Sequence, residues 1–168
     1  MKLAAFVFAG FVFIAATGCG PSRSSITAAQ RKEAARIFQE GEFALTLRDL
    51  KRAEGLFEKA ADACPDAGGY WMALGTTRMR LGKRSAAKAA YQKALDAFED
   101  EATTARADSR PVIQQVVMLA LLGRADDARG LVKKLPGRFP NDVAVTAFVS
   151  GRQLEEMLAD PKFKELAL

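Results

Sequence analysis

Few residues in this chain can do chemistry, and histidine is not among them. The chain therefore lacks the commonest general base and the commonest zinc ligand. Its two cysteines, Cys19 and Cys64, are far apart in the sequence, whereas a zinc site needs about four clustered ligands. We expect no metal, no cofactor, no small-molecule substrate and no enzymatic activity.

Two acidic groups are the remaining candidates for acid–base chemistry, Glu99 to Glu101 and Asp126-Asp127. Neither lies beside a nucleophile motif, and such charge runs usually cover a solvated helix face. We interpret both as exposed helix surface. Cys64, beside Pro65, has two interpretations: it pairs with another protein, or it is buried and inert. We favour burial, because free cysteine is among the most buried residue types.

Composition indicates one helical domain. The 168 residues are 49% hydrophobic, enough for a packed core, with only two tyrosines and one tryptophan. We predict an all-α fold. The net charge of +5 is a mild excess, and no basic run is interleaved with aromatic residues. This argues against nucleic-acid binding.

The N-terminus has the pattern of a secretory leader. A basic start at Lys2 precedes an apolar stretch from Leu3 to Ala16, too short to span a bilayer as a helix. Ala16-Thr17-Gly18-Cys19 resembles the lipobox of bacterial lipoprotein precursors, although Ala16 stands where that family prefers leucine. The resemblance implies a signal peptide over residues 1–18 and lipid on Cys19. The alternative is an ordinary secretory peptide that leaves Cys19 as a free thiol.

The lipoprotein resemblance also implies a location. Two or three acyl chains on one cysteine would anchor the protein stably in a membrane. Gly20, rather than aspartate, follows the cysteine, which in enteric-type sorting resembles an outer-membrane destination. We expect a lipid-anchored cell-envelope protein, at the outer membrane facing the periplasm rather than at the inner membrane. Gly20 to Ser25 is small and polar and contains a proline, so we assign residues 19–26 to the lipidated cysteine and a flexible tether.

Helical patterns fill residues 27–168. Thr27 and Gln30 fit a capping box, which predicts a helix from about Ala28. Helical stretches of about a dozen residues follow, and we predict breaks at Arg48-Asp49, Pro65 to Gly69, Gly82, Gly123 and Pro136 to Pro140. At the end we predict helices over Val143 to Ser150 and Gln153 to Ala159, and one starting at Pro161.

The helical part is internally repetitive. One trio of residues, Ala53, Phe57 and Pro65, recurs 34 positions later as Ala87, Tyr91 and Glu99, and 41 positions after that as Ala128, Val132 and Pro140. We assign the seven additional residues to an insertion over Asp100 to Ser109. It is either a helical extension or a loop, and we favour the extension.

The middle unit carries Trp71, Leu74-Gly75, Ala87 and Tyr91 at spacings that resemble the tetratricopeptide repeat. Arg78 stands where that family has tyrosine, and the first and third units match less well. The resemblance implies a right-handed α-α superhelix of about three hairpins, over residues 34–67, 68–101 and 109–142, with a helical cap over 143–168.

The same resemblance assigns packing roles to small and aromatic residues. Gly41 and Gly75 would lie where paired helices cross, facing Ala53 and Ala87, and the aromatic residues would fill the space between hairpins. The residues assigned to packing are Gly41, Ala53, Phe57, Trp71, Leu74, Gly75, Ala87, Tyr91 and Ala128.

Such arrays bind a protein or peptide partner in a groove lined by the first helix of each hairpin. The groove positions are Phe38, Glu42, Leu45, Met72, Thr76, Met79, Arg80, Ile113, Val117 and Leu121. We expect Ile113 and Val117 to belong to the core instead. The remaining surface, mostly apolar, suits a hydrophobic helix or unfolded segment. We expect an envelope adaptor; the alternative is a carrier or accessory subunit that binds exported apolar segments.

Overall fold

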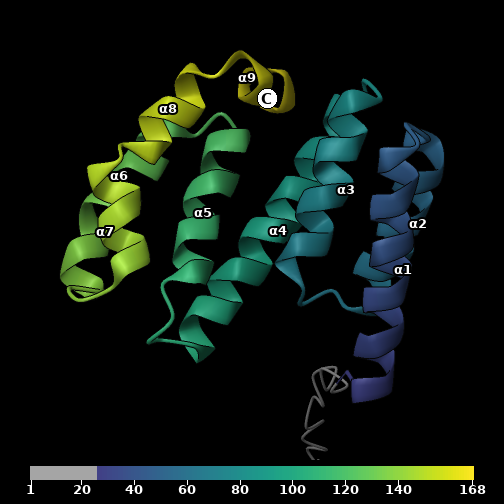
Figure 1. Cartoon of the computed structure of the whole chain (residues 1–168), viewed down its shortest axis with the longest axis horizontal. Helices are drawn as coiled ribbons and strands as arrows, with labels where there is room; N and C mark the ends of the chain where they lie inside the picture. The colour runs from purple at the N-terminus through teal and green to yellow at the C-terminus, as the bar shows by residue number, and fades with distance from the viewer. Residues whose placement is uncertain (1–25) are drawn as a thin grey trace, which may run out of the picture.

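The computed structural model describes residues 26–168, which form nine helices and no strand (Figure 1). The prediction of an all-α fold is confirmed for this part of the chain. Within it, no helix is both long and apolar enough to cross a bilayer. The leader, Cys19 and most of the tether lie outside the described residues. The helices are α1 Ala28–Thr46, α2 Leu50–Ala63, α3 Gly68–Arg80, α4 Arg84–Thr104, α5 Arg110–Leu121, α6 Ala125–Arg138, α7 Val143–Ser150, α8 Gln153–Ala159 and α9 Pro161–Leu166.

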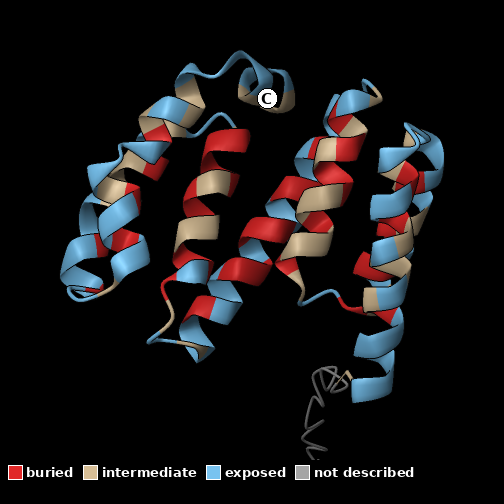
Figure 2. Cartoon of the chain, viewed as in Figure 1, coloured by how far each residue is buried: buried red, intermediate tan, exposed pale blue. Residues whose placement is uncertain are grey.

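The helices pack in sequential pairs. α1 packs on α2, α3 on α4 and α5 on α6, and neighbouring pairs meet where α2 contacts α3 and α4 contacts α5. Figure 2 shows that the buried residues lie on the helix faces turned toward one another. α7 and α8 cover α5 and α6, and α9 returns to α3 and α5. Each hairpin therefore buries its apolar face only with the help of its neighbours.

The first helix begins as its sequence predicts. The Thr27 hydroxyl accepts from the Gln30 backbone N–H at 3.2 Å, and the Gln30 side-chain oxygen accepts from the Thr27 N–H at 2.8 Å. Two amides that a helix start leaves unpaired are satisfied in this way. The capping box is confirmed.

The turns inside the three hairpins, which we call inner turns, share one hydrogen-bond pattern. Their central residues are Arg48, Gly82 and Gly123, all with positive φ. In each, the next residue's N–H bonds to a carbonyl five residues back, as Asp49 does to Ala44 at 3.0 Å. This is the Schellman ending of a helix, in which glycine is favoured because it adopts positive φ without strain. Arg48 adopts the same conformation at a cost that glycine avoids.

The outer turns, which join one hairpin to the next, locate the seven additional residues. Each starts at a residue whose carbonyl accepts the N–H three positions on: Cys64, Ala105 and Phe139. Their spacings are 41 and then 34, whereas the inner turns are spaced 34 and then 41. The added residues therefore lie between Gly82 and Ala105. α4 accordingly has 21 residues, while α2 and α6 have 14 each.

This corrects the predicted boundaries of the insertion. The preferred helical extension is present, but it runs only to Thr104, and residues 105–109 form an ordinary outer turn. The predicted break at Pro136 is also wrong, because α6 continues to Arg138. Pro136 lies in the last turn of α6, where a missing N–H and a local kink disturb few hydrogen bonds.

Glycine and an aromatic ring fit together inside the first two hairpins. A methyl group built at Gly41 would lie 2.6 Å from the Phe57 ring, and one at Gly75 would overlap the Tyr91 ring. Both rings are fully buried. Each ring packs on the glycine of its own hairpin. The other predicted packing residues, Ala53, Trp71, Leu74, Ala87 and Ala128, are all buried.

Candidate partner-binding surfaces

The apolar groove residues predicted for the first two hairpins lie on α1 and α3. Phe38 and Leu45 of α1 and Met72 of α3 are half-buried and pack against the core. The Phe38 ring stacks on Tyr70 of α3 with 4.7 Å between ring centroids, which joins the two helices. Their half-exposed side chains form a surface that we call the α1/α3 face.

Three polar groove positions differ in how they are placed. Glu42 and Arg80 are exposed, so both are available to a partner. Thr76 is half-buried, and its hydroxyl donates to the Ala73 carbonyl at 3.0 Å. That hydroxyl already has a backbone partner within its own helix, so Thr76 offers mainly its methyl group to a ligand.

Two of the predicted groove residues are core residues. Met79 is 7% exposed and Leu121 is 3% exposed. Both lie at the C-terminal ends of their helices, α3 and α5, where α9 folds back onto the array (Figure 1). Ile113 and Val117 are half-buried and pack against the core, as Phe38, Leu45 and Met72 do. Met79 and Leu121 are therefore the predicted groove residues that the fold buries.

The last nine residues, 160–168, form a segment that we call the strap. The Asp160 carboxylate accepts from the Lys162 N–H at 2.8 Å and caps α9. The Tyr91 hydroxyl donates to the Leu166 carbonyl at 2.9 Å, and the Leu168 N–H donates to the Leu121 carbonyl at 2.9 Å. The strap thus connects α4 and α5 at the end of the molecule that carries the inner turns.

Tyr91 links the core to the strap. Its ring lies on Gly75 and is fully buried, while its hydroxyl reaches the strap backbone. Burial raises the pKa of this hydroxyl well above its ordinary value, so it remains a neutral hydrogen-bond donor at physiological pH.

The C-terminal end of α1, at the first inner turn, exposes large apolar side chains. Phe43 is 61% exposed and Leu47 is 59% exposed, one helical turn apart. They project from the side of α1 opposite to Phe38 and Leu45, because Phe43 lies about 140° from Phe38 and about 200° from Leu45 around the helix. Two large apolar side chains exposed side by side are typical of contact surfaces.

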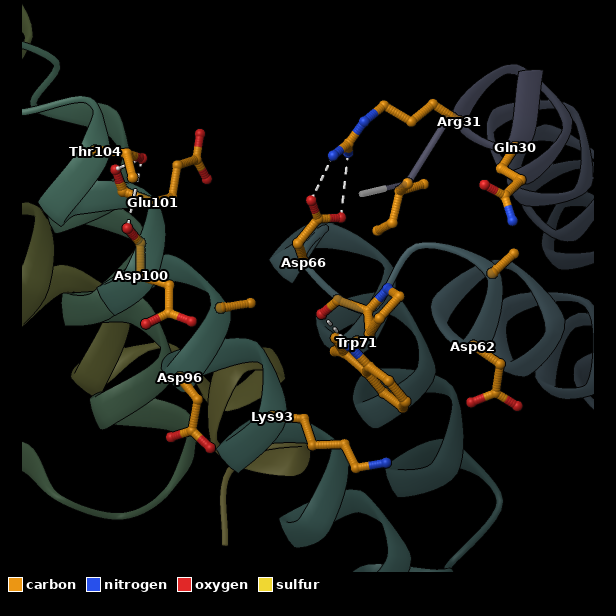
Figure 3. A pocket seen from close by; sticks show the side chains of 14 residues that line it. Gln30, Arg31, Asp62, Asp66, Trp71, Lys93, Asp96, Asp100, Glu101 and Thr104 are labelled. Carbon is orange, nitrogen blue, oxygen red and sulfur yellow. Dashed lines mark hydrogen bonds and ion pairs between the residues drawn. The ribbon is translucent and has the colours of Figure 1, made fainter. Parts of the chain in front are cut away.

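A cleft of about 1100 Å³ lies at the opposite end, among the outer turns (Figure 3). One wall is the start of α1 and the first outer turn, with Arg31, Asp62 and Asp66. The other wall is the second half of α4, including Asp96 and Glu101. With 14 residues, α4 would end at Ala97, so the extra two turns build much of this wall.

Carboxylates dominate the lining of this cleft. The five that line it are Asp62, Asp66, Asp96, Asp100 and Glu101, against the two cations Arg31 and Lys93. Arg31 forms an ion pair with Asp66, and the Lys93 ammonium lies 4.0 Å from the centre of the Trp71 ring. The Trp71 indole N–H donates to the Pro65 carbonyl at 3.0 Å. A lining of this charge attracts cations, although the whole chain is basic.

The sequence interpretation missed this cleft. It treated Glu99 to Glu101 as ordinary exposed helix, and Glu99 and Glu101 are indeed exposed. The available signal was the spacing of Asp96 and Asp100, which places both on one face of a helix lengthened by two turns. What faces them from the first hairpin depends on how the hairpins pack.

Cys64 is buried beside the cleft at the first outer turn and has no disulfide partner among the described residues. Burial raises the pKa of its thiol, which keeps it neutral and weakly reactive. The prediction of a buried cysteine is confirmed. Within residues 26–168, the cleft included, no group of three or more acidic or cysteine side chains has the arrangement of a metal site.

Comparison with known proteins adds no relative to this description. No protein-family model matches the chain, and no curated protein matches its sequence. The function is therefore argued from the surfaces described above.

Proposed function

We propose that this chain is a lipid-anchored, tetratricopeptide-like adaptor that binds a protein partner in the bacterial cell envelope. The observation that carries the proposal is the repeated hairpin: three Schellman inner turns and two glycine–aromatic crossings at repeat spacing. An array of this kind has a continuous core and leaves the first helices of its hairpins to contact other proteins.

The anchor fits this role. Six residues separate Cys19 from Ile26, where the described structure starts. A tether of that length reaches about 24 Å when fully extended. Lipid on Cys19 would therefore keep the helical array next to the membrane, and we propose the periplasmic face of the outer membrane.

The α1/α3 face is the proposed partner surface. Its half-exposed residues Phe38, Leu45 and Met72 are apolar. A partner segment with an apolar stripe, helical or extended, suits this chemistry, with Met72 adapting to its shape. Glu42 and Arg80 would contribute charged contacts at the edges.

One observation favours the alternative, a carrier or accessory subunit for exported apolar segments. Phe43 and Leu47 are each more than half exposed, which is costly for a protein that spends much of its time unbound. A permanent interface would leave the purified chain prone to aggregation, whereas an exchangeable one would leave a stable monomer.

Photo-crosslinking tests the proposal. A photoreactive residue at Met72 of the full-length protein, irradiated in living cells, should give one dominant envelope protein as adduct. The same residue at Lys88, exposed on α4, is the matched control and should not give that adduct. A spread of unrelated exported chains at Met72 would instead support the carrier. The absence of any adduct specific to Met72 would overturn both.

The anchor has a separate test. Replacing Cys19 by serine should move the protein from the membrane fraction to the soluble periplasmic fraction and abolish labelling by a radioactive fatty acid. Unchanged membrane association and labelling would contradict the lipid anchor.

A further inference from the structure

The strap is attached to the array by few contacts. α9 has six residues, and the strap's apolar side chains Phe163, Leu166 and Leu168 are only half-buried where they pack on the core. The backbone contributes the two hydrogen bonds to Tyr91 and Leu121. A segment held by so little apolar contact opens without the rest of the array unfolding.

The surface beneath the strap has features that require an occupant. Without the strap, the Tyr91 hydroxyl and the Leu121 carbonyl would each lose the hydrogen-bond partner described above, at the margin of the core. Unpaired polar groups of this kind cost free energy unless water or another chain satisfies them. Gly123 also lies close to the strap: a methyl group built there would lie 3.1 Å from the Leu168 carbonyl. The inner turn thus leaves room for a backbone at this position.

We propose that this surface, at the inner-turn ends of α3 and α5, is a second partner site, and that the strap is its resident occupant. The partner is a short amphipathic segment of the strap's own chemistry: one helical turn with apolar residues spaced like Phe163 and Leu166, followed by extended backbone. The Ala167 backbone, with φ of −83° and ψ of 159°, shows that extended ending. The adaptor role rests on the proposed function; the site itself does not.

Because the strap already occupies this site, a partner must displace it in order to bind. A segment joined to its own site has an effective concentration in the millimolar range. A free partner segment must therefore bind more tightly than the strap, or be held nearby by the α1/α3 face. A partner already held on the α1/α3 face would compete with the strap at a comparably high local concentration.

The test uses the full chain and a fluorescent peptide of residues 160–168. In a released variant, Phe163→Ser with Leu166→Ser, the strap loses its apolar anchors. A control variant, Lys162→Ser with Lys164→Ser, changes two exposed residues of the same helix. The released variant should bind the peptide at least tenfold more tightly than wild type or control. A peptide with serine at Phe163, Leu166 and Leu168 should not bind. Equal binding by a folded released variant, or by the serine peptide, overturns the proposal.

Hydrogen exchange on the wild-type chain keeps the proposal testable if the released variant unfolds. The Leu168 amide, bonded to Leu121, should exchange at least tenfold faster than the core amides of α3 and α5, at a rate set by local opening. Exchange of the strap only at the rate of global unfolding would overturn the proposal. Neither result depends on the crosslink from Met72, so failure of the strap and failure of the adaptor are distinguishable.

Discussion

The two ends of the hairpin array are built from the same helices and differ in character. At the inner-turn end, apolar side chains and backbone groups are covered by the strap. At the outer-turn end, the lengthened α4 and the first hairpin line an open cleft with five carboxylates. One end is occupied by the chain itself and the other is open to cations.

The difference shows how little a repeat array must change to acquire unlike surfaces. The Schellman turns recur in all three hairpins, and the glycine crossings recur in the first two. The surfaces come from two departures from the repeat, two additional turns of helix in α4 and a strap that folds back. Both lie outside the positions that the repeat pattern constrains.

The largest expected contrast is between Tyr91 and Lys93, two residues apart on α4. Tyr91→Ala removes a buried ring from the strap end and should lower the free energy of unfolding by about 3–5 kcal/mol. Lys93→Ala removes an exposed side chain over Trp71 at the cleft and should cost less than about 1 kcal/mol. Urea denaturation followed by circular dichroism measures both. Similar losses would mean that the two ends are equally well packed.

An ion pair at each end gives the next contrast. Glu54 and Arg78 are 13% and 15% exposed near the inner turns, whereas Arg31 and Asp66 are about half exposed at the cleft. Glu54→Gln leaves Arg78 without this partner in a partly buried place and should cost about 1–2 kcal/mol at pH 7. Asp66→Asn should cost less than about 1 kcal/mol.

Lowering the pH should remove the stability difference between wild type and Glu54→Gln. Burial raises the pKa of the Glu54 carboxyl, but hydrogen bonds and charges from Lys83 and Arg78 outweigh burial and hold the pKa below its ordinary value. The stabilisation is therefore present above the unfolded-state pKa of about 4.5 and is lost as pH falls. Urea melts at pH 7 and pH 3 should show the gap between wild type and Glu54→Gln closing. If the difference in unfolding free energy did not change with pH, it would come from packing and not from the charge of Glu54.

A smaller effect is expected from Tyr91→Phe, which keeps the ring and deletes the hydrogen bond to Leu166. The loss should be about 1 kcal/mol at pH 8, with faster exchange of the strap amides. Because burial raises the pKa of the Tyr91 hydroxyl, the unfolded state ionises first as pH rises above about 10. Wild type should then lose about 1.4 kcal/mol of unfolding free energy per pH unit more than Tyr91→Phe does. Urea melts near pH 11, where the variant should be the more stable of the two, check this sign.

The smallest expected change is a gain. Arg48 adopts φ of 59° at the position that Gly82 and Gly123 occupy in the later inner turns. Arg48→Gly should stabilise the protein by about 0.5–1 kcal/mol in the same melts, because left-handed backbone is strained for arginine. The reciprocal Gly82→Arg should cost a similar amount. If Arg48→Gly lowered the free energy of unfolding, the arginine side chain would stabilise the fold by more than its strained backbone destabilises it.

Local signals account for what the sequence predicted well. Three of these signals act within a few residues and can be recognised without knowing the fold. They are the Thr27 capping box, the glycines at the inner turns and Asp160-Pro161 at the start of α9. The place where the strap packs has no such local signal. The sequence marks Leu166 and Leu168 as apolar, but their contacts with Tyr91 and Leu121 join residues far apart in the chain.

The position of the insertion was missed for a related reason. Spacing between Ala87 and Ala128 shows that seven residues are added, yet it does not show where within that interval. The acidic stretch near Asp100 suggests itself as the inserted segment because its sequence shows no apolar stripe. In the structure this stretch is part of a continuous helix, in which Phe98 and Ala102 are buried between acidic neighbours.

The length of α4 has a consequence for how such a chain diverges. Seven residues advance a helix by almost two whole turns, which leaves the side chains beyond the addition within about 20° of their former direction. A step of one residue would rotate them by about 100° and bring Asp96 or Asp100 toward the core that Phe98 now enters. Descendants and ancestors of this gene should therefore vary α4 in jumps of three, four or seven codons, and the depth of the acidic cleft should change in discrete steps with them.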